Sequence, residues 1–307
     1  MSQASTMTKR GEERIAFWVL ALPAVAIYLF VMAFPTVVSV WLSLTNYTSG
    51  MLFSPDTHLN LVGFKHYARM FGDEYFWMAL QNNFLIVAIS VFGQIPLGFV
   101  FAYILYRKLV RWTGFWQTVL YIPVIISTIV VGILWQTIFS PSSGPVTAVV
   151  RMFIPGWENT LMNDPGFAMF PVLFVILWMY TGTYMIIFLA NLQRIDASIV
   201  EAARIDGATE FQVLGRIILP ALSGVIVTCA ILAISGSLKS FDLIFAMTSG
   251  GPAHRTSVLA LYMYDNAFRG APDYGIANAV STFMVVASFI LIGLTQWVEK
   301  LFGGKED

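Results

Sequence analysis

Residues 83–106 read NFLIVAISVFGQIPLGFVFAYILY and contain no Asp, Glu, Lys or Arg. A helix that crosses the roughly 30 Å hydrocarbon core of a bilayer needs about 20 apolar residues. Five further apolar runs lie at residues 16–44, 116–139, 168–190, 217–247 and 276–298, of which the run 217–247 is exceptional in containing Lys239 and Asp242. Because these runs lack the alternating pattern of membrane β-strands, they predict an all-α integral membrane protein with about six transmembrane helices.

The composition of the whole chain agrees with this prediction. Of 307 residues, 58% are hydrophobic and 11% are charged, whereas soluble domains carry about 25% charged residues. The formal net charge is zero, so we expect no nucleic-acid partner. A single cysteine, Cys229, excludes an intramolecular disulfide, and the histidines His58, His66 and His254 are scattered over expected loops, so no metal site is predicted.

Lys and Arg are distributed unequally over the segments that connect the apolar runs. The N-terminus, residues 107–116, residues 191–216 and the C-terminus together carry eleven. The alternating segments 45–82, 140–167 and 248–275 carry five. The positive-inside rule therefore predicts that both termini lie in the cytoplasm.

The expected organisation is one transmembrane domain at residues 15–300 between short cytoplasmic tails at residues 1–14 and 301–307. Several expected spans contain a proline, and these are Pro23, Pro35, Pro96, Pro123 and Pro171. A proline removes one backbone donor, so each predicts a kink whose freed carbonyl is satisfied by neighbouring helices. Hinges for gating are the alternative interpretation.

The segment between the fourth and fifth runs is charged but has a helical pattern. Residues 191–220 read NLQRIDASIVEAARIDGATEFQVLGRIILP. Ser198 with Glu201 fits a capping box, and Gly207 can adopt the positive φ of a helix end. Thr209 with Gln212 repeats the capping pattern for a second short helix that ends at Pro220. Two interpretations fit this hairpin: a docking surface for another protein, or an amphipathic hairpin on the membrane.

Three blocks of this hairpin resemble the EAA loop of the permease subunits of binding-protein-dependent ATP-binding-cassette (ABC) importers. The blocks are Glu201-Ala202-Ala203, Asp206-Gly207-Ala208 and Ile218-Leu219-Pro220. The resemblance implies a cytoplasmic coupling hairpin at residues 191–220 that docks on an ATPase subunit. It implies that Glu201, Arg204 and Asp206 belong to the polar coupling surface, that Ala202 and Ala203 permit close approach, and that Gly207 forms the turn.

A second region is similar to the carbohydrate-uptake branch of this family, in particular its maltose-type first permease subunit. The shared residues are Phe241-Asp242, Gly250-Gly251-Pro252, Thr256 and Tyr274-Gly275. The resemblance implies a permease that moves a sugar, most simply an oligosaccharide, across a bacterial or archaeal cytoplasmic (inner) membrane by alternating access.

The resemblance also implies partners. These are a second permease subunit in a heterodimer, two cytoplasmic ATPase subunits, an extracytoplasmic solute-binding protein, membrane lipid and the sugar itself. It implies that this chain is no enzyme and holds no cofactor, because ATP and Mg bind to the partner ATPase.

Hydroxyl and aromatic side chains share faces of the fourth and fifth runs. They are Tyr180, Thr183, Tyr184, Ser237 and Ser240. Sugars need hydrogen bonds at their edges and apolar stacking on their faces, so these residues are candidates for the solute path, while helix packing is the alternative. Lys239 and Asp242 are three residues apart and can pair on a continuous helix, either as a structural clasp or in the solute path.

Other functional classes were weighed against the importer permease. A secondary transporter, or an ABC importer for a polyol or glycerol phosphate, is the alternative. No convincing internal repeat of the kind found in many secondary transporters is visible. An intramembrane enzyme is disfavoured, since no His-Glu-x-x-His, Gly-x-Ser-x-Gly or paired His and Asp within a span offers a catalytic centre.

Overall fold

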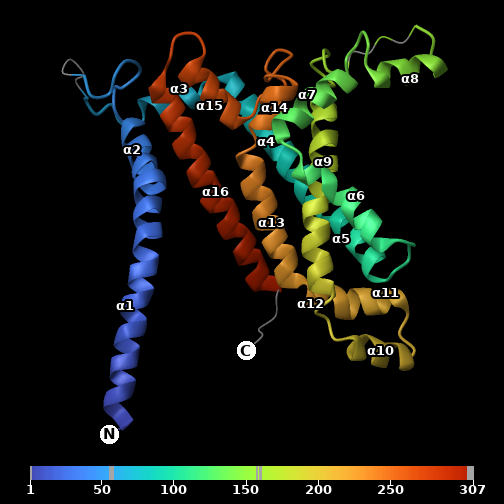
Figure 1. Cartoon of the computed structure of the whole chain (residues 1–307). Helices are drawn as coiled ribbons and strands as arrows, with labels where there is room; N and C mark the ends of the chain where they lie inside the picture. Colours follow the sequence, from blue (N-terminus) through green and yellow to red (C-terminus); the bar gives the residue numbers. More distant parts are fainter. Residues whose placement is uncertain (1, 55–58, 157, 159–160, 303–307) are drawn as a thin grey trace. The chain divides into compact units, whose positions relative to one another are not determined.

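The computed structural model describes residues 2–54, 59–156, 158 and 161–302. His58 therefore lies outside the described residues. Within them every extended regular element is a helix, and Thr45 and Leu61 form an isolated β-bridge (Figure 1). The α-helices are α1 Ser2–Tyr28, α2 Phe34–Leu42, α3 Lys65–Phe71, α4 Glu74–Ile89, α5 Ile95–Tyr106, α6 Thr113–Ile125, α7 Thr128–Ile138, α8 Pro145–Phe153, α9 Met169–Leu192, α10 Ala197–Ile205, α11 Glu210–Val213, α12 Leu219–Ala221, α13 Ser223–Leu238, α14 Asp242–Met247, α15 Leu259–Phe268 and α16 Tyr274–Phe302.

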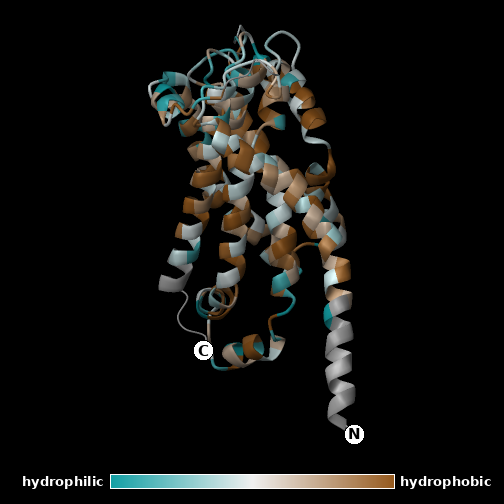
Figure 2. Cartoon of the chain, turned by 90° about the vertical axis from the view of Figure 1, so that its left-hand side faces the viewer, coloured by the Kyte–Doolittle hydropathy of each residue, from teal (hydrophilic) through white to brown (hydrophobic). Residues whose placement is uncertain are grey.

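Four stretches of the described chain are long and apolar enough to cross a membrane. They are Ala16–Leu42, Glu74–Tyr106, Met169–Leu192 and Tyr274–Trp297. Two bent pairs, Thr113–Ile125 with Thr128–Ile138 and Glu210–Ala221 with Ser223–Leu238, raise the number to six if each is one span. In Figure 2 hydrophobic residues run along the long helices and hydrophilic residues gather in the connecting segments. The prediction of an all-α membrane protein with about six spans is confirmed.

The third predicted span, residues 116–139, is broken. α6 and α7 meet at 97°, and the connecting residue Ile126 is extended. α7 packs closely on α14, because a Cβ atom added to Gly132 would lie 2.7 Å from the Cβ of Ala246. This close packing of two helices far apart in the sequence accounts for the bend, which a run of apolar residues cannot reveal.

The fifth predicted span, residues 217–247, is broken twice. α12 and α13 meet at 65° at Leu222, so the hairpin's second helical stretch ends at Ala221, one residue after the predicted end at Pro220. α13 then ends at Leu238 and α14 begins at Asp242. The charges suit this second break, because a cation is favourable at a helix C-terminus and an anion at an N-terminus, where Lys239 and Asp242 lie.

At three prolines of the chain, Pro35, Pro96 and Pro220, a π-helical turn precedes the proline. The turns Leu29–Ala33, Ser90–Gln94 and Leu214–Ile218 each lie directly before a helix whose second residue is proline. A proline ring clashes with the carbonyl four residues back and lacks an N–H donor. A π-turn inserts one extra residue into the hydrogen-bond ladder and thereby widens the helix before the ring.

The described chain forms two compact units. One contains the residues up to Met70 together with Asn266–Phe283. In it α1 begins at Ser2, so one helix continues through the segment predicted as a tail at residues 1–14. The side chain of Ser39 donates to Asn278 Oδ1 (2.7 Å), and Arg69 forms an ion pair with Asp273 (2.8 Å). These bonds join α2 to the second turn of α16 and α3 to the residue that directly precedes α16.

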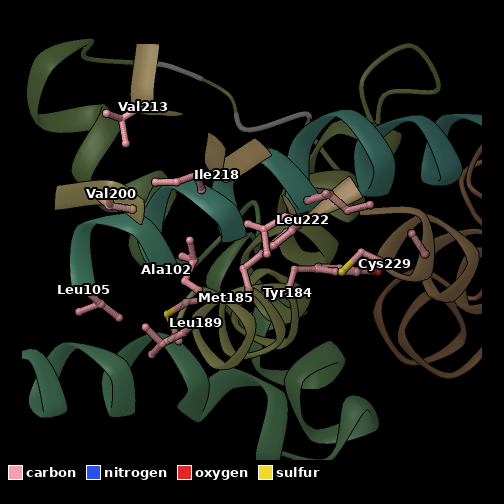
Figure 3. Close-up of a cluster of buried hydrophobic side chains, with 14 residues drawn as sticks. Ala102, Leu105, Tyr184, Met185, Leu189, Val200, Val213, Ile218, Leu222 and Cys229 are labelled. Carbon is pink, nitrogen blue, oxygen red and sulfur yellow. The ribbon is translucent and has the colours of Figure 1, made fainter. Parts of the chain in front are cut away.

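The other unit contains Phe71–Asp265 and the remainder of α16. Its apolar core has two clusters. One cluster joins α5, α9, α13 and the α10–α11 hairpin, and Figure 3 shows its side chains converging from these helices. The other joins α4, α7, α9 and α14 through residues such as Val131, Val175 and Leu243. α9 contributes to both clusters, so it is the central helix of this unit.

Gly98 allows α5 and α9 to approach closely. A Cβ atom at Gly98 would lie 2.7 Å from the Cβ of Tyr184 and 2.9 Å from the backbone nitrogen of Met185. Small residues at such crossings let helices pack in membranes, where no hydrophobic force between helices is available.

We therefore expect Gly98→Ala to destabilise the protein by about 1–3 kcal/mol, because the added methyl group meets backbone atoms that cannot yield locally. The measurement is the thermal unfolding midpoint of the purified protein in detergent. Gly293→Ala in α16 is the matched control, since nothing lies within 4 Å of a Cβ atom added there. Equal midpoints for the two variants would contradict the expected crossing.

Candidate functional site

A cavity of about 300 Å³ lies within the second unit. Its walls come from the α4–α5 kink, α9, the end of α13 and the start of α14, with Thr128 contributing from α7. All five residues predicted for a solute path line this cavity: Tyr180, Thr183, Tyr184, Ser237 and Ser240. The structure thus brings together residues from two spans, and their contact with a solute stays a prediction.

The polar groups of the cavity fall into two classes. The Ser237 hydroxyl donates to Ala233 O (2.7 Å) and to Ser90 Oγ (3.3 Å), so it is engaged in packing. The side-chain hydroxyls of Tyr180, Thr183 and Ser240 have no hydrogen-bond partner among the described residues. These three hydroxyls are therefore available to a polar molecule in the cavity.

Sequence reasoning missed the wall contributed by α4 and the π-turn. Ser90 and Gln94 are buried and line the cavity, and Gln94 Nε2 donates to Ile176 O (2.7 Å) on α9. A signal was present, because Asn83, Ser90 and Gln94 are polar residues spaced by seven and four, which places them on one helical face. π-turns inside helices often occur at functional sites, which agrees with the position of Ser90–Gln94.

The predicted ion pair of Lys239 and Asp242 is not formed. Both side chains are exposed and line the cavity, but within the described part of the chain they make no ion pair with each other or with any other residue. The prediction assumed a continuous helix, and the break at residues 239–241 removes the common helical face. The cavity is thus lined by one cation and one anion that this chain leaves unpaired.

A second, wider pocket of about 680 Å³ lies at the other end of α14. Met247 and the Gly251-Pro252 turn line it. The other lining residues include the uncharged polar residues Gln136, Thr137, Ser140, Ser143, Asn163 and Thr248. Since Asp242 and Leu243 at the start of α14 line the cavity, this six-residue helix lies between the two hollows. Both α14 and α7 therefore contribute to the two hollows, since Thr128 lines the cavity and Gln136 and Thr137 line the wider pocket.

The α10–α11 hairpin has the predicted helix-turn-helix form. Gly207 has φ of +83° at the turn, and Thr209 with Gln212 forms the predicted capping box. The cap of α10 differs from the prediction: the Asp196 carboxylate accepts from the Ser198 N–H (2.9 Å), so Asp196 is the N-cap and not Ser198. This hydrogen bond lowers the pKa of Asp196. Asp196 lies two residues before Ser198, and its carboxylate binds a backbone N–H that has no partner within the helix, so the helix begins earlier than predicted.

The outer surface of the hairpin presents the residues predicted for coupling. Glu201, Ala202, Arg204, Asp206 and Gly207 are exposed, and Ala203 is half-buried. Sequence reasoning missed two large apolar side chains beside the turn. Ile205 is 86% exposed and Phe211 is 87% exposed. Apolar side chains presented this fully on a charged hairpin are suited to a protein partner.

The inner surface of the hairpin is attached to the transmembrane helices in two ways. Val200 and Val213 are buried in the same apolar cluster as Leu105 of α5 (Figure 3). In addition, the Arg107 guanidinium at the end of α5 binds both carboxylate oxygens of Glu210, at 2.6 and 3.2 Å. Arg204 Nε adds a third contact to Glu210 at 3.2 Å.

The hairpin and the cavity share this apolar cluster. Tyr184 and Ala233 line the cavity and belong to the cluster that contains Val200 and Val213. Close-packed cores transmit displacement because they have few voids. The hairpin and the cavity wall are therefore connected by packed side chains.

The chain is similar to known proteins over most of its length. Residues 94–303 match the sequence profile of the family described as binding-protein-dependent transport system inner membrane component. The chain is 32% identical to the lactose transport system permease protein LacF of Rhizobium radiobacter over 277 residues, which cover 89% of this chain and 90% of that protein. It is 30% identical to the probable ABC transporter permease protein YurN of Bacillus subtilis over 300 residues, which cover 97% and 99%.

A further relative is the trehalose/maltose transport system permease protein MalF of Thermococcus litoralis, 29% identical over 279 residues that cover 90% of this chain and 92% of that protein. Among solved structures, a chain of a bacterial alginate ABC transporter in complex with an alginate pentasaccharide-bound periplasmic protein superposes with a TM-score of 0.81. That likeness covers 97% of this chain and 98% of the other at 22% identity, and it concerns the fold.

The contacts of Glu210 generate a prediction about the hairpin. Glu210→Gln removes the charge that holds Arg107 and Arg204, and solvent screening keeps the contribution of such exposed pairs small. We expect amide hydrogen exchange across α10 and α11 to accelerate up to about fivefold, while exchange in α9 stays unchanged.

Glu201→Gln is the matched control, since Glu201 is exposed and forms no ion pair with any described residue. Both variants are compared in the purified permease chain in detergent, without the ATPase, by hydrogen exchange and mass spectrometry. Equal exchange rates in the two variants would mean that the apolar contacts alone hold the hairpin.

Proposed function

Because the chain belongs to the family of binding-protein-dependent transport system inner membrane components, we propose that it is the permease subunit of an ABC importer that carries an oligosaccharide. The observation that carries this proposal is the apolar cluster that joins an exposed helical hairpin to a cavity lined by free hydroxyl and aromatic groups. Family membership gives no support to the alternative of an ion-driven secondary transporter.

The sugar assignment rests on the chemistry of the cavity and on the relatives. Tyr180, Thr183 and Ser240 offer hydroxyls, and Tyr180, Tyr184 and Phe241 offer aromatic rings. Sugars present hydroxyl edges and apolar faces, which such a lining complements. Relatives of this chain are named for lactose, trehalose/maltose and diacetylchitobiose transport. These names support a di- or oligosaccharide as the solute.

We place the hairpin and both termini in the cytoplasm, because the segments on that side carry most of the Lys and Arg residues. Two ATPase subunits then bind ATP and Mg and dock on the hairpins, with Ile205 and Phe211 as apolar anchors and Glu201, Arg204 and Asp206 as polar contacts. A second permease subunit completes the solute path in a heterodimer. A solute-binding protein delivers the sugar on the opposite side of the bacterial or archaeal inner membrane.

The proposed mechanism is alternating access driven through the hairpin. Closure of the ATPase subunits moves α10 and α11, and the shared core transfers the displacement to α5, α9 and α13. The break at residues 239–241 lets α14 tilt against α13, which opens the cavity to one side and closes it to the other. Lys239 and Asp242 lie at this joint and find partners in the second permease subunit or in the hydrated path.

The proposal is tested with the complex reconstituted in proteoliposomes together with its partner subunits and binding protein. We expect uptake to require both ATP and the binding protein. A thermal-shift screen of the binding protein against lactose, trehalose, maltose and chitobiose derivatives identifies the sugar. Uptake driven by an ion gradient alone would overturn the importer assignment, and stabilisation by amino acids with no response to any glycan would overturn the sugar assignment.

The turn of the hairpin gives a mutational test of coupling. Gly207 has a left-handed backbone, and nothing lies within 4 Å of a Cβ atom added there, so the effect of a substitution is purely conformational. A left-handed backbone costs a β-branched residue about 1–2 kcal/mol. We expect Gly207→Val to reduce uptake and its coupled ATP hydrolysis about tenfold.

Gly207→Asn is the control, because asparagine tolerates the left-handed region. It should retain most of the uptake. Normal uptake and normal ATPase stimulation in Gly207→Val would show that the turn geometry has no part in coupling.

The free hydroxyls give a test of the solute path. Thr183→Val keeps the shape of the side chain and removes its hydroxyl, and a hydrogen bond contributes about 1 kcal/mol. We expect roughly a fivefold rise in the KM of uptake. Thr181→Val is the matched control on the same helix, because the Thr181 hydroxyl donates to Leu177 O and does not line this cavity. An equal KM in the two variants would remove Thr183 from the path.

A further inference from the structure

Two adjacent asparagines on α4 lie outside the coupling hairpin and the cavity wall. Asn82 is 6% exposed and Asn83 is 1% exposed. A buried amide in a membrane-spanning helix is costly unless its polar atoms are hydrogen-bonded. The bonds that these two side chains make therefore indicate why polar residues stand in this apolar stretch.

Asn83 uses both ends of its amide. Its Nδ2 donates to Ser237 O (2.9 Å), and its Oδ1 accepts from the Leu259 N–H (2.8 Å). Ser237 lies in the last turn of α13, and Leu259 is the first residue of α15. Helix ends leave backbone groups without partners inside the helix. One side chain thus joins the end of one helix to the beginning of another.

Asn82 holds the segment between these two points. Its Nδ2 donates to Arg255 O (2.9 Å) and to Ser257 O (2.8 Å) in the loop that follows α14. The loop is itself closed by Thr256, whose hydroxyl lies 2.7 Å from Thr248 Oγ1 and donates to Gly251 O (2.8 Å). The loop of residues 248–258 is therefore fixed internally and fixed to α4.

The contacts continue from Asn83 to the cavity. Ser237, whose carbonyl accepts from Asn83, donates through its hydroxyl to Ser90 Oγ at 3.3 Å. Ser237 and Ser90 both line the cavity. One hydrogen-bonded path therefore runs from the loop 248–258 through Asn82 and Asn83 to the cavity wall.

The two Asn83 bonds lie at both ends of residues 238–258, which contain the helix break, α14 and the loop. The segment is thus held at its two ends and at its loop by one turn of α4, and its break at residues 239–241 lies between the Ser237 bond and α14.

We propose that Asn83, with Asn82, is the positioning element that makes the loop 248–258 and the cavity wall change conformation together. A solute-binding protein that docks on this loop then acts on the cavity through α4. The inference rests on the proposed importer function, which places this loop on the outer face.

The test uses two fluorescent reporters in the assembled complex, each in a Cys229→Ala background. Ala253→Cys places a bimane label on the exposed part of the loop, and Leu232→Cys places one at the cavity. ATP, Mg and vanadate are the probes, so no sugar need be known. We expect both reporters to respond in the complex with both asparagines.

Asn83→Asp is the principal variant. It keeps the acceptor for the Leu259 N–H and loses the donor to Ser237 O. We expect the cavity reporter to respond and the loop response to fall at least fivefold. Asn82→Ala, which removes the two donors to the loop, should reduce the loop response in the same direction.

Asn278→Asp is the matched control outside the hairpin and the cavity, because it likewise keeps an acceptor, here for the Ser39 hydroxyl, and loses a donor to a backbone carbonyl, here Tyr274 O in its own helix. It should preserve both responses. Proportionate responses of both reporters in Asn83→Asp would overturn the proposal, as would failure of both the Asn82 and Asn83 variants to assemble, which would assign the pair a purely structural role. Absence of any cavity response in the complex with both asparagines would instead overturn the proposed importer function.

Discussion

In lipid, every backbone N–H and carbonyl group must find its partner within the protein, and the rest of this structure depends on that constraint. A long helix meets it unaided, as in Met169–Leu192. A helix that breaks inside a span exposes orphan groups, so a break persists only where protein or a hydrated cavity receives them. The break at residues 239–241 lies at the cavity. Just before the break, the carbonyl of Ser237 accepts a hydrogen bond from the side-chain amide of Asn83 on α4. The residues that break the helix are therefore also residues that line the cavity.

Hydropathy predicted the number and type of the spans because burial in lipid demands long apolar runs, whatever the tertiary contacts. It could not predict the bend between α6 and α7, since that depends on the approach of Gly132 to Ala246 across more than a hundred residues of sequence. The break at residues 239–241 was readable in principle. Lys239 and Asp242 have the signs that suit the C-terminus of one helix and the N-terminus of the next, yet they were interpreted as a pair on one continuous helix.

The candidate site divides in the same way. The hairpin was predictable from local chemistry, because Gly207 and the Thr209–Gln212 capping box act over a few residues. The tyrosine and hydroxyl residues of α9 and α13 were predictable from helical periodicity, and the structure gathers them at one cavity. The cavity wall formed by Ser90 and Gln94 was missed. The sequence alone does not distinguish a polar residue that packs between helices from one that lines a cavity. Only the partner across the helix pair, here Ile176 O, distinguishes the two.

The two apolar clusters divide the helices of this unit into two packed groups that meet at α9. The cluster that reaches the hairpin contains Val213, Tyr184 and residues of α13, whereas the other contains Leu243, Ile244 and Met247 of α14. The loop after α14 is in turn bound to α4 through Asn82. The break at residues 239–241 is therefore the joint between the two groups, and residues of this joint line the cavity. Because the chain is interrupted at this joint, a relative movement of the two groups would change the cavity wall first.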